Sequence, residues 1–326
     1  MLTPVRHDLH RPALTATLLA LAVVAMSPTT SRATVVRFNS VVGSFDVRMY
    51  DTATPLTVAN ILNYVNDGDF VDSIVHRAEN SYTQQPDGSF VANPFVIQGG
   101  NWSLPDGGVL TQIPSDPPVL NEPGISNLRG TMALARQSGV VNSGTNNWFV
   151  NTGDNEFLDN VDQGFTVFGR VVNEGMEVVD AISFMQQATI RNQFNQLLGE
   201  TFPVHGDTSS GISRENFVLF TSVEELDIPD GDADFDGDVD GTDFLYWQRG
   251  YGTVSDMAAD FNGDAAVDEL DFSIWESNYG MTSPLSSFHS VPEPATLLLL
   301  CLAVLAFGGT LWRGAPLGRS SNLPTS

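Results

Sequence analysis

The sequence predicts a mainly β domain with two helices, followed by a small α-helical module built on calcium loops and by a C-terminal transmembrane helix. Three observations support this prediction. Short strand-like runs separated by turn residues fill the first two thirds of the chain, an acidic motif recurs after 28 residues in the last third, and an uncharged apolar run follows a Pro-Glu-Pro motif near the C-terminus. Many short strands with two helices favour a closed antiparallel barrel.

The composition excludes several classes of function. The chain has 326 residues and 42% hydrophobic content, which is enough for two domains and at least one sizeable core. Its 14 basic and 39 acidic residues give a net charge of −25, which removes the attraction that nucleic acid or anionic lipid requires. All basic residues are Arg, so lysine chemistry is excluded. The lone Cys301 allows no internal disulfide and no cysteine-based metal site.

Hydrophobic periodicity predicts the elements of the first two thirds. Residues 57–67 and 176–184 carry apolar side chains at helical spacing. In residues 43–50 polar and apolar side chains alternate, as in a half-buried strand, with Asp46 and Arg48 on the polar side. The remaining strands are predicted at residues 35–38, 95–98, 130–135, 147–151, 166–172 and 216–222.

The N-terminus reads as a secretory signal peptide. Arg6 and Arg11 precede a continuous apolar run at residues 13–26, and small residues then offer a cleavage site near Ala33. The alternative is an amphipathic N-terminal helix, which the unbroken apolar run disfavours. The sequence therefore predicts export.

The C-terminus carries a second targeting signal. Residues 291–294 contain the Pro-Glu-Pro motif, and the uncharged segment 295–312 precedes Arg313 and Arg319. Eighteen helical residues span about 27 Å, close to the thickness of a hydrocarbon core, and the two Arg residues favour the cytoplasmic side. This order resembles the PEP-CTERM sorting signal, which implies processing by an exosortase-type enzyme. The alternative is a plain C-terminal membrane anchor.

The acidic repeat has the spacing of a calcium site. Oxygen ligands at positions 1, 3, 5, 9 and 12 of a loop converge on one hard cation, while position 7 lends a carbonyl. The candidate ligands are Asp232, Asp234, Asp236, Asp238, Asp240 and Asp243 in the first loop and Asp260, Asn262, Asp264, Asp268 and Asp271 in the second. Position 6, which favours a positive φ, is Gly237 in the first loop and Ala265 in the second. We therefore expect Ca²⁺ in both loops, more weakly in the second.

The repeat pair resembles a type I dockerin. Position 12 is Asp instead of the longer Glu of EF-hands, and each loop is followed by one helix. The resemblance covers about 50 residues and implies Ca²⁺ binding and a cohesin-like partner. The alternative is a calcium-stapled spacer without a partner, because so small a unit can use metal in place of a core.

The β domain resembles the cyclophilin family of peptidyl-prolyl cis-trans isomerases. The resemblance lies in VHR at residues 75–77, PFVIQGG at 94–100, NE at 121–122, GTMALAR at 130–136, the stretch 143–151, FLD at 157–159 and FGRV at 168–171. It implies an eight-stranded antiparallel barrel capped by two helices, an enzyme of the EC 5.2.1.8 class, and catalysis without a cofactor. The implied substrates are proline-containing polypeptides.

The chemistry of this reaction sets simple demands on a site. An X–Pro bond isomerises over a barrier of about 18–20 kcal/mol because the amide has partial double-bond character. A catalyst must hold the proline in an apolar pocket and favour the twisted amide, whose nitrogen accepts a hydrogen bond. The resemblance assigns the donor to Arg77. The other implied site residues are Phe95, Val96, Phe149 and Leu158 in the proline pocket, Gln98 at the peptide backbone, Ala135 and Arg136 at the preceding residue, and Asn147, Phe157 and Phe165 around them.

Several positions depart from the family pattern. Asn147 replaces a glutamine and is one methylene shorter, so a hydrogen bond to the peptide backbone is in question. Phe157 replaces a tryptophan, which should weaken cyclosporin binding more than catalysis, and Phe165 replaces a histidine. About thirteen extra residues between Arg77 and Phe95 predict a polar hairpin or lid near the active face. In the sequence, no cysteine or carboxylate stands at ligand spacing from His76 or His205, and both histidines are predicted to be structural.

The predicted organisation combines these segments. It comprises a signal peptide (1–33), a cyclophilin-like domain (34–226), a linker (227–231), calcium repeats (232–281), a linker (282–290) and the sorting signal with its transmembrane anchor (291–319). The predicted function is prolyl isomerisation in exported proteins, in the periplasm, the outer envelope or at the cell surface, with no nucleic-acid partner. The alternative is a catalytically weak peptide-binding or structural module tethered at the envelope.

Overall fold

The computed structural model describes residues 32–191 and 197–282, apart from the side chains of residues 191–201. The predicted sorting segment, and all but the last two residues of the predicted signal peptide, lie outside these ranges. Within them, no helix is both long and apolar enough to cross a membrane. The fold is mainly β, with an eight-stranded antiparallel sheet and flanking helices, as the sequence predicts.

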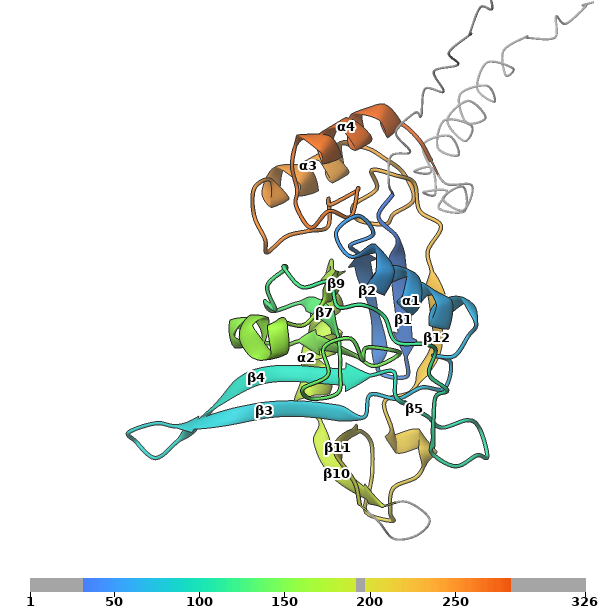
Figure 1. Cartoon of the computed structure of the whole chain (residues 1–326), viewed down its shortest axis with the longest axis vertical. Coiled ribbons are helices and arrows are strands. Elements are labelled where there is room, and N and C mark those ends of the chain that lie inside the picture. The colour runs from blue at the N-terminus through green and yellow to red at the C-terminus, as the bar shows by residue number, and fades with distance from the viewer. Residues whose placement is uncertain (1–31, 192–196, 283–326) are drawn as a thin grey trace, which may run out of the picture. The chain divides into compact units, whose positions relative to one another are not determined.

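The elements follow one another along the described chain (Figure 1). They are β1 (Val35–Ser40), β2 (Gly43–Met49), α1 (Pro55–Asn66), β3 (Arg77–Gln84), β4 (Phe90–Gly99), β5 (Trp102–Ser103), β6 (Thr111–Gln112), β7 (Thr131–Leu134), β8 (Trp148–Asn151), the 3-10 helix η1 (Glu156–Gln163), β9 (Val167–Val172), α2 (Gly175–Ser183), β10 (Gln186–Arg191), β11 (Leu197–Val204), the 3-10 helix η2 (Arg214–Asn216), β12 (Phe220–Glu225), α3 (Gly241–Gly250) and α4 (Glu269–Asn278).

The large sheet has the strand order β12-β1-β2-β9-β7-β8-β4-β3. Its two edges are joined just ahead of β3 and β12. The amide of Val75 donates to the carbonyl of Val218 over 3.0 Å, and the amide of Phe220 donates to the carbonyl of Ser73 over 2.9 Å. These bonds link the two ends of the sheet, as barrel closure requires.

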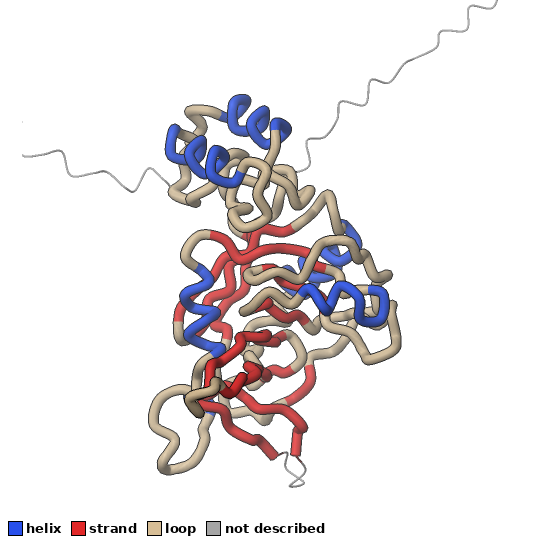
Figure 2. The backbone as a smooth tube through the Cα atoms, turned by 90° about the vertical axis from the view of Figure 1, so that its left-hand side faces the viewer, coloured by secondary structure: helices blue, strands red, loops and turns tan. Residues whose placement is uncertain are grey.

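The barrel interior holds the largest hydrophobic core. Alternate residues of the strands supply it, and α1 and α2 add buried residues to it. Figure 2 shows helices on the flanks of the strands. Helix α1 contacts β12, and α2 contacts β2 and β9. Members of this core include Phe38, Phe45, Val47, Met49, Ile61, Tyr64, Ile97, Trp148, Phe168, Val179 and Phe220.

Helix α1 begins at a carboxylate supplied from far along the chain. Pro55 is at its first turn, where a missing amide proton costs nothing. Glu122 accepts hydrogen bonds from the amides of Leu56 (3.1 Å) and Thr57 (2.8 Å). An anion at a helix N-terminus satisfies exposed amides and complements the helix dipole. This gives a physical role to the Asn-Glu pair of the sequence motif.

Two parts of the sheet differ from the sequence expectations. The predicted strand at residues 95–98 extends back to Phe90 and pairs with β3, so the extra residues between Arg77 and Phe95 form a hairpin, one of the two forms that the sequence predicts, although no periodicity marked β3 as a strand. The small sheet of β10 and β11 was not predicted either, and the strand expected at residues 216–222 begins only at Phe220. The sequence of β3 is almost entirely polar, so it carries no alternation to mark a strand.

The C-terminal repeats pack against the barrel. The second loop accepts backbone hydrogen bonds from barrel residues: Ala33 donates to the carbonyl of Phe261 (2.8 Å), and Thr52 donates to the carbonyl of Gly263 (3.0 Å). A Cβ at Gly263 would come within 2.7 Å of the backbone nitrogen of Asp51. The absence of a side chain there permits this close approach.

Arg48 lies at the centre of this contact. It is only 3% exposed, although it belongs to the polar side of the alternating strand β2. Its guanidinium lies 5.2 Å from the ring centroid of Phe235 and 5.4 Å from that of Phe261, one from each loop, and Nη2 donates to the carbonyl of Asp232 over 3.1 Å. Burial lowers the pKa of Arg48 to about 10, against the opposing effect of nearby carboxylates. The polar side of β2 is therefore partly an internal contact surface.

Candidate functional site

The register of the sheet aligns four residues that are far apart in the sequence. Arg77 on β3 is opposite Gln98 on β4, Gln98 is opposite Phe149 on β8, and Phe149 is opposite Ala133 on β7. Residues directly opposite on antiparallel strands share a face of the sheet. The structure thus brings the predicted donor, the predicted backbone-binding amide and the predicted pocket aromatic into one row.

A β-bulge places two consecutive pocket residues on the same side. Val96 is opposite Glu79 and Pro94 is opposite Asn80, so Phe95 has no partner on β3. An extra residue in one strand locally breaks the alternation of faces. Phe95 and Val96 accordingly both join the hydrophobic cluster that contains Phe149.

The Arg77 side chain is held in place but remains reachable. Its Nη1 donates to Oε1 of Gln98 over 3.1 Å, and its Nη2 pairs with the carboxylate of Glu79. The guanidinium carbon lies 5.8 Å from the ring centroid of Phe95, and 35% of the side chain is exposed. A half-buried, oriented guanidinium beside an apolar surface is suited to donating a hydrogen bond to a bound amide.

The predicted proline-pocket residues form one cluster. Val96, Phe149 and Leu158 are buried, and Phe95 packs against them. Phe157 is 58% exposed and stacks on Phe95 with ring centroids 5.8 Å apart. Its neighbour Leu158 is buried in the same 3-10 helix, so this short helix forms one wall of the cluster.

The far side of the cluster is formed by Phe165 and Arg136. Phe165 meets Phe149 edge to face at 5.6 Å, and the Arg136 guanidinium lies 4.4 Å from the Phe165 ring centroid. Arg136 also donates to the carbonyl of Gly164 over 2.8 Å, and burial lowers its pKa. Ala135 donates its amide to the carbonyl of Asn147 over 2.9 Å. All eleven predicted isomerase-site residues therefore lie in or beside this one region of the sheet.

Two polar residues predicted near the site have different environments. The Oδ1 atom of Asn147 is buried and makes no hydrogen bond within the described part of the chain. His76 is fully buried beside Arg77, and burial lowers its pKa to about 3. A histidine with that pKa stays neutral under ordinary conditions and does not act as a proton donor in the site.

The two acidic loops share one backbone conformation. Positions 4 and 6 have positive φ in both loops: Phe235 (64°) and Gly237 (94°) in the first, Gly263 (68°) and Ala265 (67°) in the second. The carboxylate at position 1 accepts the amides of positions 4 and 6 in each loop. Position 6 adopts the left-handed conformation that the spacing predicts, at the Ala as well as at the Gly.

The remaining predicted ligands divide between the loop interior and the helix ends. Carboxylate oxygens of Asp232, Asp234 and Asp236 lie within 4.8 Å of one another. Asp240 and Asp268 cap α3 and α4, and Asp243 and Asp271 complete the capping boxes. The other members, Asp238, Asp260, Asn262 and Asp264, lie in the loops between these positions.

The burial of these carboxylates is consistent with a bound cation. Burial raises the pKa of Asp232 to about 7 and that of Asp271 to about 6, and it raises the pKa of Asp260 well above its ordinary value. Buried carboxylates at short range repel one another unless a positive charge lies among them. An all-oxygen donor set of this kind fits Ca²⁺.

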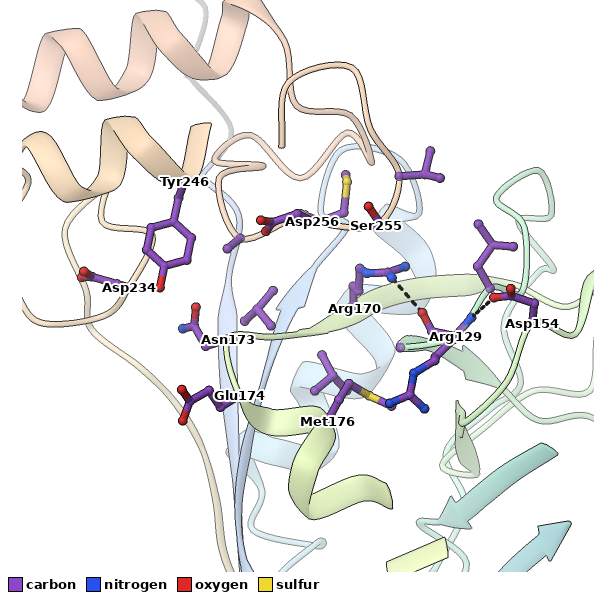
Figure 3. A pocket seen from close by; sticks show the side chains of 17 residues that line it. Arg129, Asp154, Arg170, Asn173, Glu174, Met176, Asp234, Tyr246, Ser255 and Asp256 are labelled. Carbon is purple, nitrogen blue, oxygen red and sulfur yellow. Dashed lines mark hydrogen bonds between the residues drawn. The ribbon is translucent and has the colours of Figure 1, made fainter. Parts of the chain in front are cut away.

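A cavity of 960 Å³ lies between the β9–α2 corner and the repeats. Figure 3 shows Arg170 donating to the carbonyl of Arg129 (2.7 Å), whose amide donates to Asp154 (2.9 Å). Asp234 and Tyr246 line the cavity from the repeats. Apart from Asp234, none of the predicted site residues lines this cavity, and no sequence pattern predicted it.

Comparisons with known proteins identify two regions of the chain. Residues 35–196 match the family model of the cyclophilin type peptidyl-prolyl cis-trans isomerase/CLD, and residues 290–313 match that of the PEP-CTERM protein-sorting motif. The peptidyl-prolyl cis-trans isomerase A of Dickeya dadantii (strain 3937) is 36% identical over 183 residues, covering 54% of this chain and 86% of that protein. Peptidyl-prolyl cis-trans isomerase B of Escherichia coli (strain K12) is 34% identical over 154 residues, covering 45% of this chain and 82% of that protein.

Proposed function

Because the chain belongs to the cyclophilin-type peptidyl-prolyl cis-trans isomerases, we propose that it isomerises X–Pro bonds of exported proteins and that Arg77 favours the twisted amide. The observation that carries the proposal is the oriented Arg77 guanidinium, bonded to Gln98 and placed beside the Phe95 ring. The enzyme class itself follows from the family. The exported substrates and the residue roles are the proposed parts.

The proposed mechanism needs no covalent step. The cluster of Phe95, Phe149 and Leu158 holds the proline ring, so the carbonyl on the preceding residue is free to rotate. As the amide twists, its nitrogen loses conjugation and becomes a hydrogen-bond acceptor. Arg77 then donates to that nitrogen, which stabilises the twisted state more than either planar state. Gln98 orients both Arg77 and the peptide backbone.

A coupled isomerisation assay with a proline tetrapeptide tests this proposal. Full-length protein is expected to accelerate isomerisation well above the uncatalysed rate, and Arg77→Ala is expected to lower kcat/KM by about 100-fold, or about 2.7 kcal/mol. Arg37→Ala is the matched control, because Arg37 pairs with Asp46 on β1 and β2, away from the site. Folded wild-type protein with no activity would contradict the proposal.

A weak peptide-binding module is the alternative, and two observations favour it. Nη2 of Arg77 is already paired with Glu79, and Oδ1 of Asn147 has no hydrogen-bond partner among the described residues. Either feature would reduce transition-state stabilisation while leaving the apolar pocket intact. Tetrapeptide binding without catalysis would support this second reading.

We further propose that the two acidic loops bind Ca²⁺. The support is the all-oxygen donor set, the left-handed conformation at position 6 and the raised pKa of Asp232. When bound, the ion would add positive charge to that of Arg48 among these buried carboxylates. Calorimetric titration of EDTA-treated protein with Ca²⁺ should detect binding that Asp232→Ala weakens. A cohesin-like partner and a purely structural role remain the two alternatives for the module.

The PEP-CTERM sorting motif indicates export and membrane association. We propose that an exosortase-type enzyme processes the chain at residues 291–319 and that the signal peptide ends near Ala33. The destination would be the periplasm, the outer envelope or the cell surface. Fractionation of cells producing the full chain, and of cells producing a chain cut after residue 290, should place only the first with the envelope.

A further inference from the structure

We propose that the hairpin of β3 and β4 beyond Arg77 and Phe95 is a second substrate-binding surface, which takes extended, unfolded polypeptide on one side of the proline. The inference deepens the proposed isomerase function and rests on it. It concerns the segment that exceeds the family pattern in length, roughly residues 80–94.

The hairpin continues directly from the isomerase site. Strands β3 and β4 stay paired from the Arg77–Gln98 pair to the Gln84–Phe90 pair, and the turn at Gln85–Ser89 is closed by a 2.7 Å backbone hydrogen bond. Figure 1 shows the hairpin projecting away from the other strands. The strands that carry the donor and the pocket therefore also form the projection.

One face of the hairpin extends the active face. Because successive side chains of a strand point to opposite faces, Ser81 and Thr83 lie on the same side of β3 as Arg77. Opposite them on β4 are Asn93 and Val91, and Asn93 donates to the Thr83 hydroxyl over 2.8 Å. Beyond the Glu79–Val96 pair, a row of small polar and apolar groups thus runs outward on this face.

The other face exposes aromatic rings. Tyr82 is 63% exposed and Phe90 is 64% exposed, one on each strand. Tyr82 and the exposed Phe184 line a cavity of 310 Å³ between the hairpin and the end of α2. Aromatic side chains in solvent lose the stabilisation that burial would give, so their presence on a projection points to a surface that is covered in use.

The charge of the hairpin suits a polypeptide partner of varied sequence. Between Asn80 and Gly99 the only charged residue is Asp87, in a chain with a net charge of −25. Strand β3 is also an edge of the eight-stranded sheet. Edge strands usually carry charges that prevent pairing with other chains, and the outer part of β3, from Asn80 to Gln84, carries none, so it can accept an added extended strand. Tyr, Ser, Thr and Asn together are side chains that adapt to many peptide sequences.

The dimensions distinguish short from long substrates. From Arg77 to Gln84 the strand spans about 23 Å at ~3.3 Å per residue. An extended tetrapeptide is about 13 Å long at the same rise. A tetrapeptide with its proline beside Arg77 therefore cannot reach the tip of the hairpin, whereas an unfolded protein chain can.

The test compares two substrates on the full-length chain. The double variant Tyr82→Ser, Phe90→Ser removes the exposed rings and keeps the hairpin pairing, and Val109→Ser is the control, because Val109 is equally exposed in a different loop. With the proline tetrapeptide, the double variant should keep kcat/KM within twofold of wild type. In the proline-limited refolding of a protein substrate, its kcat/KM should fall at least fivefold. Circular dichroism should match wild type.

The other possible results of this experiment count against either the hairpin proposal or the isomerase function. Equal losses on both substrates, or no loss on either, would overturn the hairpin proposal. Wild-type protein that catalyses neither reaction would overturn the isomerase function instead. In that case binding of a fluorescent, permanently unfolded chain decides the hairpin separately, and unchanged affinity in the double variant would refute it.

Discussion

Arg77 and Gln98 lie directly opposite each other on β3 and β4, and a 3.1 Å hydrogen bond joins their side chains. They are 21 positions apart in the sequence, and the whole projecting hairpin lies between them. The strand register brings them together, and it adds Phe149 from β8 to the same row. The geometry of the site is thus a property of the sheet, and the length of the hairpin does not disturb it.

Asn147→Gln should raise isomerase activity. The buried Oδ1 of Asn147 makes no hydrogen bond among the described residues, and one further methylene would bring the amide closer to a bound peptide. We expect kcat/KM on the tetrapeptide to rise about threefold to tenfold, which corresponds to one added hydrogen bond of ordinary strength. Asn66→Gln, at an exposed position of α1, should change nothing. A lower activity in Asn147→Gln would count against this role.

The sequence predicts the barrel well because most of its strands alternate and its helices show helical spacing. Residues such as Val47 and Ile61 mark the interior face without any tertiary information. Alternation could not identify strand β3, because its residues are almost all polar and show no apolar face. The left-handed φ at Gly237 and Ala265 followed from loop spacing alone, because the loop closes only with such a turn at position 6.

The packing of the repeats against the barrel could not be predicted from the sequence. Alternation identifies Arg48 as facing away from the barrel interior, but it cannot say whether solvent or another segment lies there. Asp232, one of the covering residues, is 184 positions away in the sequence. The bulge at Phe95 could not be predicted either, because the residues around it do not indicate which residue of a strand lacks a partner.

Arg48→Met should destabilise the chain, and more so without calcium. The change leaves the carbonyl of Asp232 without its donor and removes a cation from among three buried carboxylates. We expect a loss of roughly 2–3 kcal/mol in urea unfolding at pH 7 in EDTA, and a smaller loss in excess Ca²⁺, which supplies charge to the same carboxylates.

Arg37→Met is the control for this experiment. Arg37 makes a partly exposed ion pair with Asp46 on the same two strands, and such pairs contribute about 0–1 kcal/mol. Equal losses in EDTA and Ca²⁺ for Arg48→Met would show that charge compensation is not its role.

A matched pair of substitutions tests the strain at position 6. Ala265 has a φ of 67° and Gly237 a φ of 94°. Ala265→Gly should raise the free energy of unfolding by about 0.5–1 kcal/mol. The change relieves the strain of a left-handed Ala, and this gain is partly offset because Gly has more conformational entropy in the unfolded chain. Gly237→Ala should lower it by a similar amount. Urea unfolding in Ca²⁺ measures both, and shifts of the same sign in the two variants would contradict the account.

His76 should make the fold sensitive to acid. Its pKa is about 3 when folded, because of burial, against about 6.5 when unfolded. Between these values the unfolded chain binds a proton that the folded chain does not, so this contribution is complete above pH 6.5 and is lost as the pH falls toward 3. The expected loss is about 1.4 kcal/mol per pH unit.

The contribution of His76 is isolated by a difference measurement. Urea unfolding of wild type and of His76→Leu is followed from pH 7 to pH 4, so that the carboxylates common to both proteins cancel. The difference in unfolding free energy should move against wild type as the pH falls. Parallel profiles would mean that His76 is protonated in the folded protein or titrates equally in both states.

In the proposed mechanism, Arg77 acts on the twisted amide and contributes little to holding the peptide. Exchange NMR on a labelled X–Pro peptide bound to the full-length protein measures isomerisation on the enzyme and binding in the same sample. For Arg77→Ala the account predicts a Kd within about threefold of wild type and an on-enzyme exchange rate at least about 100-fold lower. Weaker binding with an unchanged exchange rate on the bound peptide would contradict it.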